Sequence, residues 1–364
     1  MKSATSLALW QQLKVAQLVD GDLPTELGLS PWYIRVMQGF AGWLGALFLL
    51  CFVGISLWSG MAESALMIVG LFNCGAACLI FHRMKNSEFM TQFALAVSFS
   101  GQMLFVIGLF LSLELHEPSA GIFCGIALFE VLLTLFIPNF IHRVVSSFAA
   151  LISLSLSMGY VGWYELVPAM IAAVFALVWL NEIRFAAYAH VLQPVGYGFT
   201  FALLSLTGLR LYYYDFWGLF GYGGYNDQAA MWLLAPWLCT AGISAVLSYV
   251  VYQLLLREQV AVISKIGGVA IIGTLLLAVL SWWAPSIVIV LMVVLVGFSA
   301  GNRVLLGLGI VGLGLFLSHY YYQMQATLLT KSFVLAVSGI TLLVARIALN
   351  KCFPPMIRDS HDAS

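Results

Sequence analysis

Apolar stretches of membrane length occupy most of this chain and limit the folds open to it. Of its 364 residues, 62% are apolar and 8% are charged, whereas globular domains carry about 25% charged residues. A run of roughly 20 apolar residues crosses the hydrocarbon core of a bilayer as one helix. The sequence therefore predicts an all-α fold, a polytopic integral membrane bundle of about 12 transmembrane helices. The predicted spans are 36–58, 61–81, 89–113, 119–137, 144–162, 165–181, 193–211, 229–253, 260–281, 285–300, 303–318 and 331–349.

The distribution of lysine and arginine predicts the orientation of these spans. When the N-terminus is placed inside, only Arg210 and Lys331 of the 15 Lys and Arg residues fall outside. Positive charge in short inner loops is the main determinant of orientation. We expect an N-in/C-in topology, with residues 1–35 as a short cytoplasmic segment, 36–349 as the transmembrane domain and 350–364 as a cytoplasmic tail. Short separations after the ninth and tenth spans leave a total of roughly 11 to 13 open.

Composition and motifs also bear on partners and chemistry. A net charge of zero gives no basic patch for nucleic acid, so the expected partner is the lipid bilayer. Residues 1–35 lack the early apolar core of a cleavable signal peptide, and we expect the first span to direct insertion. The sequence contains no phosphate-binding loop, nucleophile elbow or HExxH motif. We therefore expect no catalytic residues, cofactor or metal site; the sequence disfavours an enzyme without deciding the matter.

Three polar residues fall near the midpoints of the second, third and fourth predicted spans. Asn73, Gln102 and Glu130 would lie at depths that agree to roughly 3–5 Å, given the rise of a helix. An ionised carboxylate at the bilayer centre costs at least about 2.5–3.5 kcal/mol. We therefore expect Glu130 to be protonated and hydrogen bonded to an amide such as Gln102 or Asn73. This candidate intramembrane polar site would carry protons or accept a cationic substrate; the alternative is interhelical bonding that contributes about 0.6–2 kcal/mol.

Two His-Arg pairs end predicted spans at the inner surface. They are His82-Arg83 and His142-Arg143. Cations at such positions suit helix C-termini and lipid headgroups. The sequence therefore favours an anchoring role for both pairs over a catalytic one.

The outer face combines many aromatic residues with few positive charges. The segment 210–228 is dense in Tyr, Phe, Trp and Gly. One interpretation is an aromatic belt at headgroup level, and the other is a lid or platform for a sugar or lipid headgroup. Arg210, Asp215 and Lys331 are candidate contacts for a partner or ligand on this face, because positive charge is scarce there.

Several stretches resemble a known bacterial family. They are Pro31 to Gly54, the pattern YY…LLxKS…G…R between Ser318 and Arg346, Gly101-Gln102, and Pro138 followed by His142-Arg143. Together they resemble the bacterial inner-membrane domain-of-unknown-function family 4401 over nearly the whole chain. The resemblance implies a Gram-negative inner membrane and a multi-protein assembly with companion membrane proteins, one of them carrying a GDYXXLXY motif. It supplies no reaction and no catalytic residues.

Three functions fit these observations to different degrees. A transporter or proton-coupled permease is favoured by the number of spans and by polar groups at mid-depth. A non-enzymatic scaffold or subunit of a membrane complex is the alternative. It rests on the missing catalytic motifs and on the companion membrane proteins that the resemblance implies. An enzyme acting on a lipid-linked substrate would use Glu63, Glu114, His116 or Asp215, and only the outer aromatic residues support it.

Overall fold

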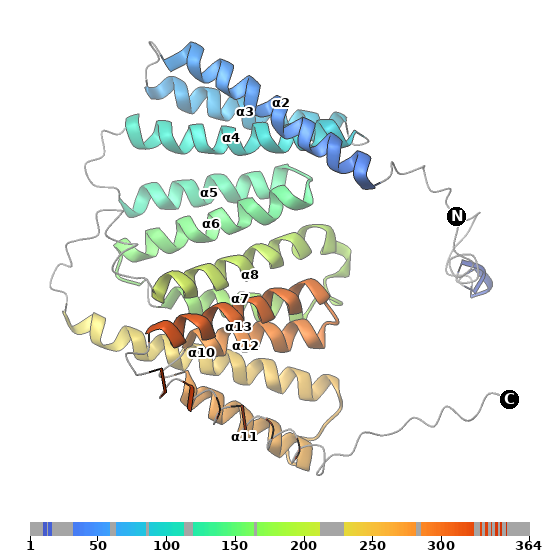
Figure 1. Cartoon of the computed structure of the whole chain (residues 1–364), viewed down its shortest axis with the longest axis vertical. Helices are drawn as coiled ribbons and strands as arrows, with labels where there is room; N and C mark the ends of the chain where they lie inside the picture. Colours follow the sequence, from blue (N-terminus) through green and yellow to red (C-terminus); the bar gives the residue numbers. More distant parts are fainter. Residues whose placement is uncertain are drawn as a thin grey trace. The chain divides into compact units, whose positions relative to one another are not determined.

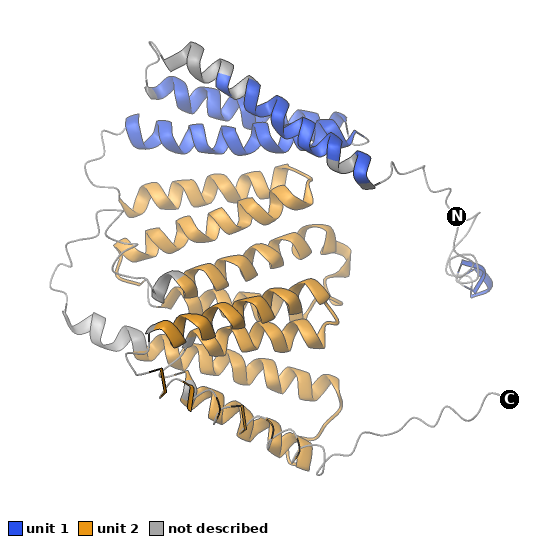
Figure 2. Ribbon diagram, viewed as in Figure 1, with its two compact units in different colours: residues 1–115 blue, residues 116–364 orange. Residues whose placement is uncertain are grey.

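Helices are the only regular secondary structure in the part of the chain that the computed structural model describes (Figure 1). The chain divides into two compact units, residues 1–115 and 116–364 (Figure 2). The described residues are 10–12, 14–16, 32–58, 63–84, 87–112, 119–163, 166–211, 229–281, 285–323 and single residues between 328 and 347.

The first unit contains three long helices whose close packing depends on glycine. A Cβ atom on Gly70 would lie 2.6 Å from the carbonyl oxygen of Gly101, and one on Gly108 would lie 2.8 Å from the backbone nitrogen of Met67. Glycine lets helix backbones approach this closely in a membrane, where packing rather than hydrophobicity drives association. The helices are α2 (Trp32–Trp58), α3 (Glu63–Arg83) and α4 (Glu88–Ser112), and α4 packs against both others.

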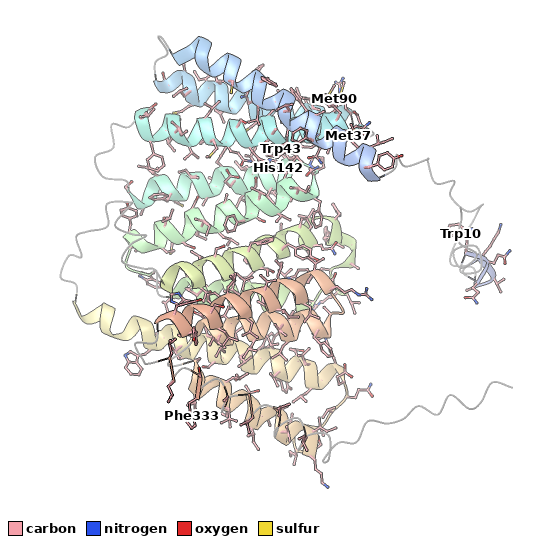
Figure 3. The ribbon with its side chains drawn as sticks, viewed as in Figure 1. Trp10, Met37, Trp43, Met90, His142 and Phe333 are labelled. Atoms are coloured by element: carbon pink, nitrogen blue, oxygen red, sulfur yellow. The ribbon has the colours of Figure 1, made fainter. Side chains whose placement is uncertain are left out.

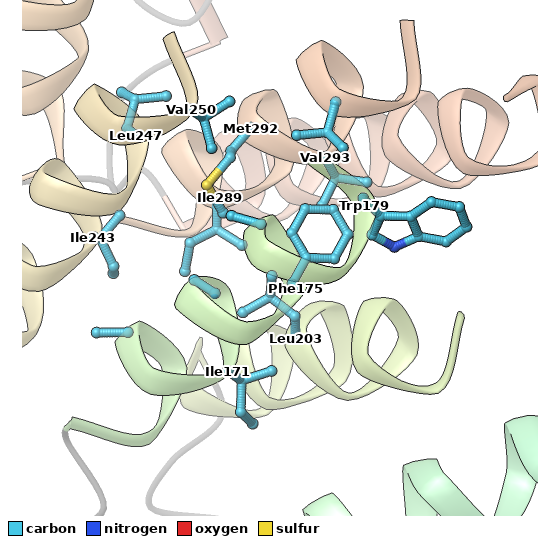
Figure 4. Close-up of a cluster of buried hydrophobic side chains, with 14 of the residues drawn as sticks. Ile171, Phe175, Trp179, Leu203, Ile243, Leu247, Val250, Ile289, Met292 and Val293 are labelled. Atoms are coloured by element: carbon cyan, nitrogen blue, oxygen red, sulfur yellow. The ribbon is translucent and has the colours of Figure 1, made fainter. Parts of the chain in front are cut away.

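The second unit packs around an apolar core. Phe175, Leu203, Leu247 and Met292 are fully buried where four helices meet (Figure 4). The helices of this unit are α5 (Ala120–Phe136), α6 (Phe140–Tyr160), α7 (Val167–Leu180), η2 (Ala186–Tyr188), α8 (Ala189–Leu211), α10 (Ala229–Arg257), α11 (Lys265–Leu280), α12 (Pro285–Ser299) and α13 (Arg303–Gln323).

The predicted all-α fold is confirmed, and each predicted span from 36–58 to 303–318 coincides with one helix. One difference concerns the span predicted at 144–162, because α6 begins one turn earlier. Asn139 caps this helix: its side-chain oxygen accepts a hydrogen bond from the backbone N–H of His142 at 3.0 Å. Most of the span 331–349 lies outside the described residues, and its described residues are helical.

Length and composition identify candidate membrane spans among these helices. Many large apolar side chains on them face outward; Phe72 is 73% exposed and Leu276 is 66% exposed. Such surfaces suit contact with lipid rather than water. The total of about 12 spans and the orientation stay predictions. Within the described residues, five helices are long and apolar enough to cross a membrane: Ser64–Arg83, Glu88–Ser112, Phe140–Tyr160, Trp237–Arg257 and Arg303–Tyr322.

The glycine contact between α3 and α4 generates a stability prediction. Gly70→Ala places a methyl group against the backbone of α4, and we expect it to lower the free energy of unfolding by about 1–3 kcal/mol. Gly75→Ala in the same helix is the matched control, because a Cβ there meets no described atom within 4 Å. That change should be neutral or stabilising by up to about 1 kcal/mol. Thermal unfolding in detergent measures both, and equal melting temperatures would contradict the close contact.

Candidate functional site

Two of the predicted site residues lie in the first unit, at one level of the α3–α4 pair. Asn73 is half-buried on α3, and its Cβ lies 3.0 Å from the position that a Cβ on Gly101 would occupy. Gln102, the next residue of α4, is 7% exposed. The structure therefore brings Asn73 to the turn of α4 that carries Gln102. Their depth in a bilayer stays a prediction.

The third predicted residue, Glu130, is buried in α5 of the second unit. Its side chain is 3% exposed and forms a hydrogen bond with the Ser146 side chain of α6. Its second carboxyl oxygen, Oε2, has no hydrogen-bond partner among the described residues. Burying a carboxyl group with one unsatisfied oxygen is costly. The predicted hydrogen bond from Glu130 to Gln102 or Asn73 joins residues of different units and stays a prediction.

A line of polar side chains continues from Glu130 along α6. The hydroxyl oxygen of Ser146 lies 3.4 Å from Nδ1 of His142, which is one turn nearer the start of the helix. His142 is fully buried in the first turn of α6 (Figure 3). A hydroxyl group can accept a proton on one side and donate one on the other. Glu130, Ser146 and His142 therefore form a polar line from the interior of the α5–α6 hairpin to the end at which α6 begins.

Arg143 lies beside this line and occupies a place that the sequence did not predict. Its side chain is 7% exposed, so it does not extend to lipid headgroups as expected. Nε donates a hydrogen bond to the carbonyl oxygen of Thr134 at 3.1 Å, and Nη1 donates one to the carbonyl oxygen of His190 at 2.9 Å. The expected interaction of the cation with a helix C-terminus is present, because Thr134 is in the last turn of α5.

The other His-Arg pair agrees better with the expectation of an exposed cation. His82 and Arg83 end α3 and are both exposed. Nδ1 of His82 lies 2.9 Å from the carbonyl oxygen of Cys78, one turn earlier in the same helix. Such a contact satisfies a carbonyl group that the helix end leaves free.

The predicted outer-face residues cannot be placed in a site. The backbone of Arg210 belongs to the last turn of α8, and its side chain is outside the described residues. Asp215 and Lys331 also lie outside the described residues. Within the described part of the chain, no group of three or more His, Cys, Asp and Glu side chains could hold a metal ion.

A second buried polar group was missed by the sequence reasoning. The Tyr197 hydroxyl on α8 donates to Oδ1 of Asn302 at 3.1 Å and accepts from its Nδ2 at 2.8 Å. Asn302 also caps α13, since Oδ1 accepts from the backbone N–H groups of Val304 and Leu305. The Trp179 ring meets Tyr197 edge-on, with centroids 5.1 Å apart. An Asn directly before a helix is the only sequence signal for this group.

Apolar helices of membrane length that enclose buried polar side chains define the class of this chain, a helical membrane protein. The chain belongs to the family described as domain of unknown function (DUF4401), which matches residues 31–352. This match confirms the resemblance seen in the sequence. Neither the curated proteins nor the solved structures contain a match to this chain.

The Tyr197–Asn302 contact can be tested by removing one hydroxyl group. We expect Tyr197→Phe to lower the free energy of unfolding by about 1–2 kcal/mol, because the half-buried Asn302 amide loses a partner. Tyr252→Phe is the control: Tyr252 is 49% exposed, and its change should stay within about 0.5 kcal/mol. Melting temperatures of the two purified variants in detergent provide the comparison. A Tyr197→Phe protein as stable as the control would show that the contact contributes nothing.

Proposed function

We propose that this protein is a proton-coupled transporter whose intramembrane site contains Glu130. The observation that carries the proposal is the buried carboxyl group of Glu130, which bonds Ser146 and whose Oε2 has no hydrogen-bond partner among the described residues. Ionisable groups within membrane spans are rare and commonly mark pathways for ions or protons. Glu130 is the proton-binding group in this proposal.

Ser146 and His142 supply a route for the proton. The Ser146 hydroxyl is in contact with both Glu130 and the His142 imidazole. A serine hydroxyl passes a proton by accepting one and donating another, and an imidazole does the same through its two nitrogens. The proton leaves Glu130 through Ser146 and reaches His142, at the end where α6 begins.

Asn73 and Gln102 of the first unit are the residues that we propose bind a solute. Their amide groups offer both donors and acceptors at one level of the α3–α4 pair. Neutral amides can hydrogen bond a polar solute without the cost of burying a second charge. In this proposal the amides bind the solute, and the carboxyl group of Glu130 binds the proton that accompanies it.

Proton movement by the reconstituted protein tests the proposal. Vesicles with a pH-sensitive dye inside should acidify faster with the protein than without it when a proton gradient is applied. Glu130→Gln removes the titrating group but keeps its size and hydrogen bonding, and should reduce this rate by about tenfold or more. Glu88→Gln is the matched control, because Glu88 is exposed at the start of α4; this variant should retain the full rate.

Two outcomes would contradict the proposal. Wild-type protein that moves neither protons nor solutes under a pH gradient would exclude transport by this site. If Glu130→Gln retained all activity while Glu130→Leu failed to fold, the carboxyl group would serve only as a hydrogen-bonding group between helices. The Ser146→Ala variant tests the route separately, and it should slow proton movement while leaving Glu130 in place.

We further propose that the protein spans the bacterial inner membrane many times with both termini inside, where companion membrane proteins bind it. Support comes from the Lys and Arg distribution and from the family. A fluorescent protein fused to the C-terminus should fluoresce, because it folds only inside the cell. Alkaline phosphatase fused after Trp58 should be active, because the first span would export it. An inactive phosphatase together with a non-fluorescent C-terminal fusion would show that the protein has the opposite orientation.

A further inference from the structure

Two backbone carbonyl groups in the second unit lack a helical donor because of proline. In a helix each carbonyl oxygen accepts from the N–H four residues later, and proline has no N–H. The residue four positions after Thr134 is Pro138, and the residue four positions after His190 is Pro194. Pro194 lies inside α8. Both carbonyl groups therefore need a partner from outside their own helix.

Arg143 is the partner of both carbonyl groups. Its Nε bonds the Thr134 oxygen at 3.1 Å and its Nη1 bonds the His190 oxygen at 2.9 Å. The planar guanidinium carries five donors in a fixed fork, so one side chain can reach two acceptors at once. A single buried side chain of α6 thus joins the last turn of α5 to the first turn of α8.

A tight crossing between α6 and α8 lies farther along the same two helices. A Cβ on Gly198 would collide with the Ser147 side chain and would lie 3.0 Å from the carbonyl oxygen of Val144. Gly198 is two helical turns past His190, about 12 Å along the axis of α8. The glycine crossing therefore holds the two helices at one point, and Arg143 holds them at the end where both begin.

We propose that Arg143 is a latch: its hydrogen bonds hold α5, α6 and α8 together at the end where α6 and α8 begin. When the Arg143–His190 bond breaks, α8 swings about the Gly198 crossing. Water then replaces the guanidinium at the free His190 carbonyl and enters beside His142. Arg143 is a positioning residue that controls access to the Glu130–Ser146–His142 line. The control of proton access rests on the proposed function, whereas the latch itself does not.

Cysteine labelling measures opening of the latch directly. Val144→Cys places a thiol next to Arg143 in sequence, where the Val144 side chain packs partly buried against the apolar core of the second unit, in a background from which the six native cysteines have been removed. Proteoliposomes with a polar maleimide on both membrane faces report how often water reaches this thiol, whatever the orientation. We expect Arg143→Gln to raise the labelling rate by about tenfold or more, since a charge-assisted hydrogen bond that favours the closed state is lost.

Two further arginine variants separate the latch from a general effect of charge. Arg143→Lys keeps the charge but replaces the fork by a single ammonium group, and it should also raise the labelling rate. Arg83→Gln is the control, because Arg83 is exposed at the end of α3; labelling should not change. An unchanged rate in Arg143→Gln would overturn the proposal, and so would a rate in Arg143→Lys equal to that of the wild type.

Pro194→Ala distinguishes a latch from a group that only satisfies a carbonyl. Alanine at this position returns an N–H to the His190 oxygen within α8. Added to Arg143→Gln, it should restore part of the lost melting temperature but leave labelling fast, because α8 is still not joined to α6. If it restored slow labelling as well, Arg143 would have only a structural role. Failure of proton transport with latch-controlled labelling intact would contradict the proposed function and not the latch.

Discussion

The structure depends on one constraint, that each backbone N–H and C=O group at membrane depth must find a partner within the protein. Within a helix these groups bond one another, whereas helix ends and prolines leave some of them without a helical partner. The described chain meets it at those points with side chains: Asn139 caps α6, Asn302 caps α13, and Arg143 serves two carbonyl groups that proline leaves free. Two of these side chains also join helices: Asn302 bonds Tyr197 of α8, and Arg143 links α6 to α5 and α8.

The same constraint explains why glycine decides which helices pair most closely. When every backbone group is satisfied inside its own helix, two helices gain little from polar contacts and must gain from close packing. At Gly70 in the first unit and at Gly198 in the second, the absence of a Cβ lets one backbone touch another helix. Other glycines, such as Gly125, meet no described atom there and contribute no such contact. The spacing of glycines in the sequence cannot distinguish those in close helix contacts from those without a contact, because it does not say which face of a helix meets a neighbour.

The sequence predicts the helices well because length and hydropathy are local properties. It also singles out Glu130, since a carboxyl group inside a span needs a partner. In the structure Ser146 of the next helix forms a hydrogen bond with Glu130, and the expected bond to an amide of the first unit stays a prediction. Beginning the span at 144 placed His142 and Arg143 outside the membrane helix, whereas the Asn139 cap places both inside it. The prolines four residues after Thr134 and His190 were a usable signal for Arg143, but only tertiary structure shows that one side chain reaches both carbonyl groups.

Arg143 and Glu130 illustrate how a membrane protein can keep two ionisable groups for different tasks. Glu130 and Thr134 are one turn apart on α5, and Arg143 donates a hydrogen bond to the Thr134 carbonyl oxygen. An ion pair between the two would keep Glu130 ionised and leave it unable to take up a proton. Because the described hydrogen bonds of the guanidinium go to carbonyl groups, Glu130 retains only a neutral hydroxyl partner. In the proposed function these two carbonyl groups therefore do more than join helices: they are the hydrogen-bond partners of the guanidinium, and the carboxyl group stays able to exchange a proton.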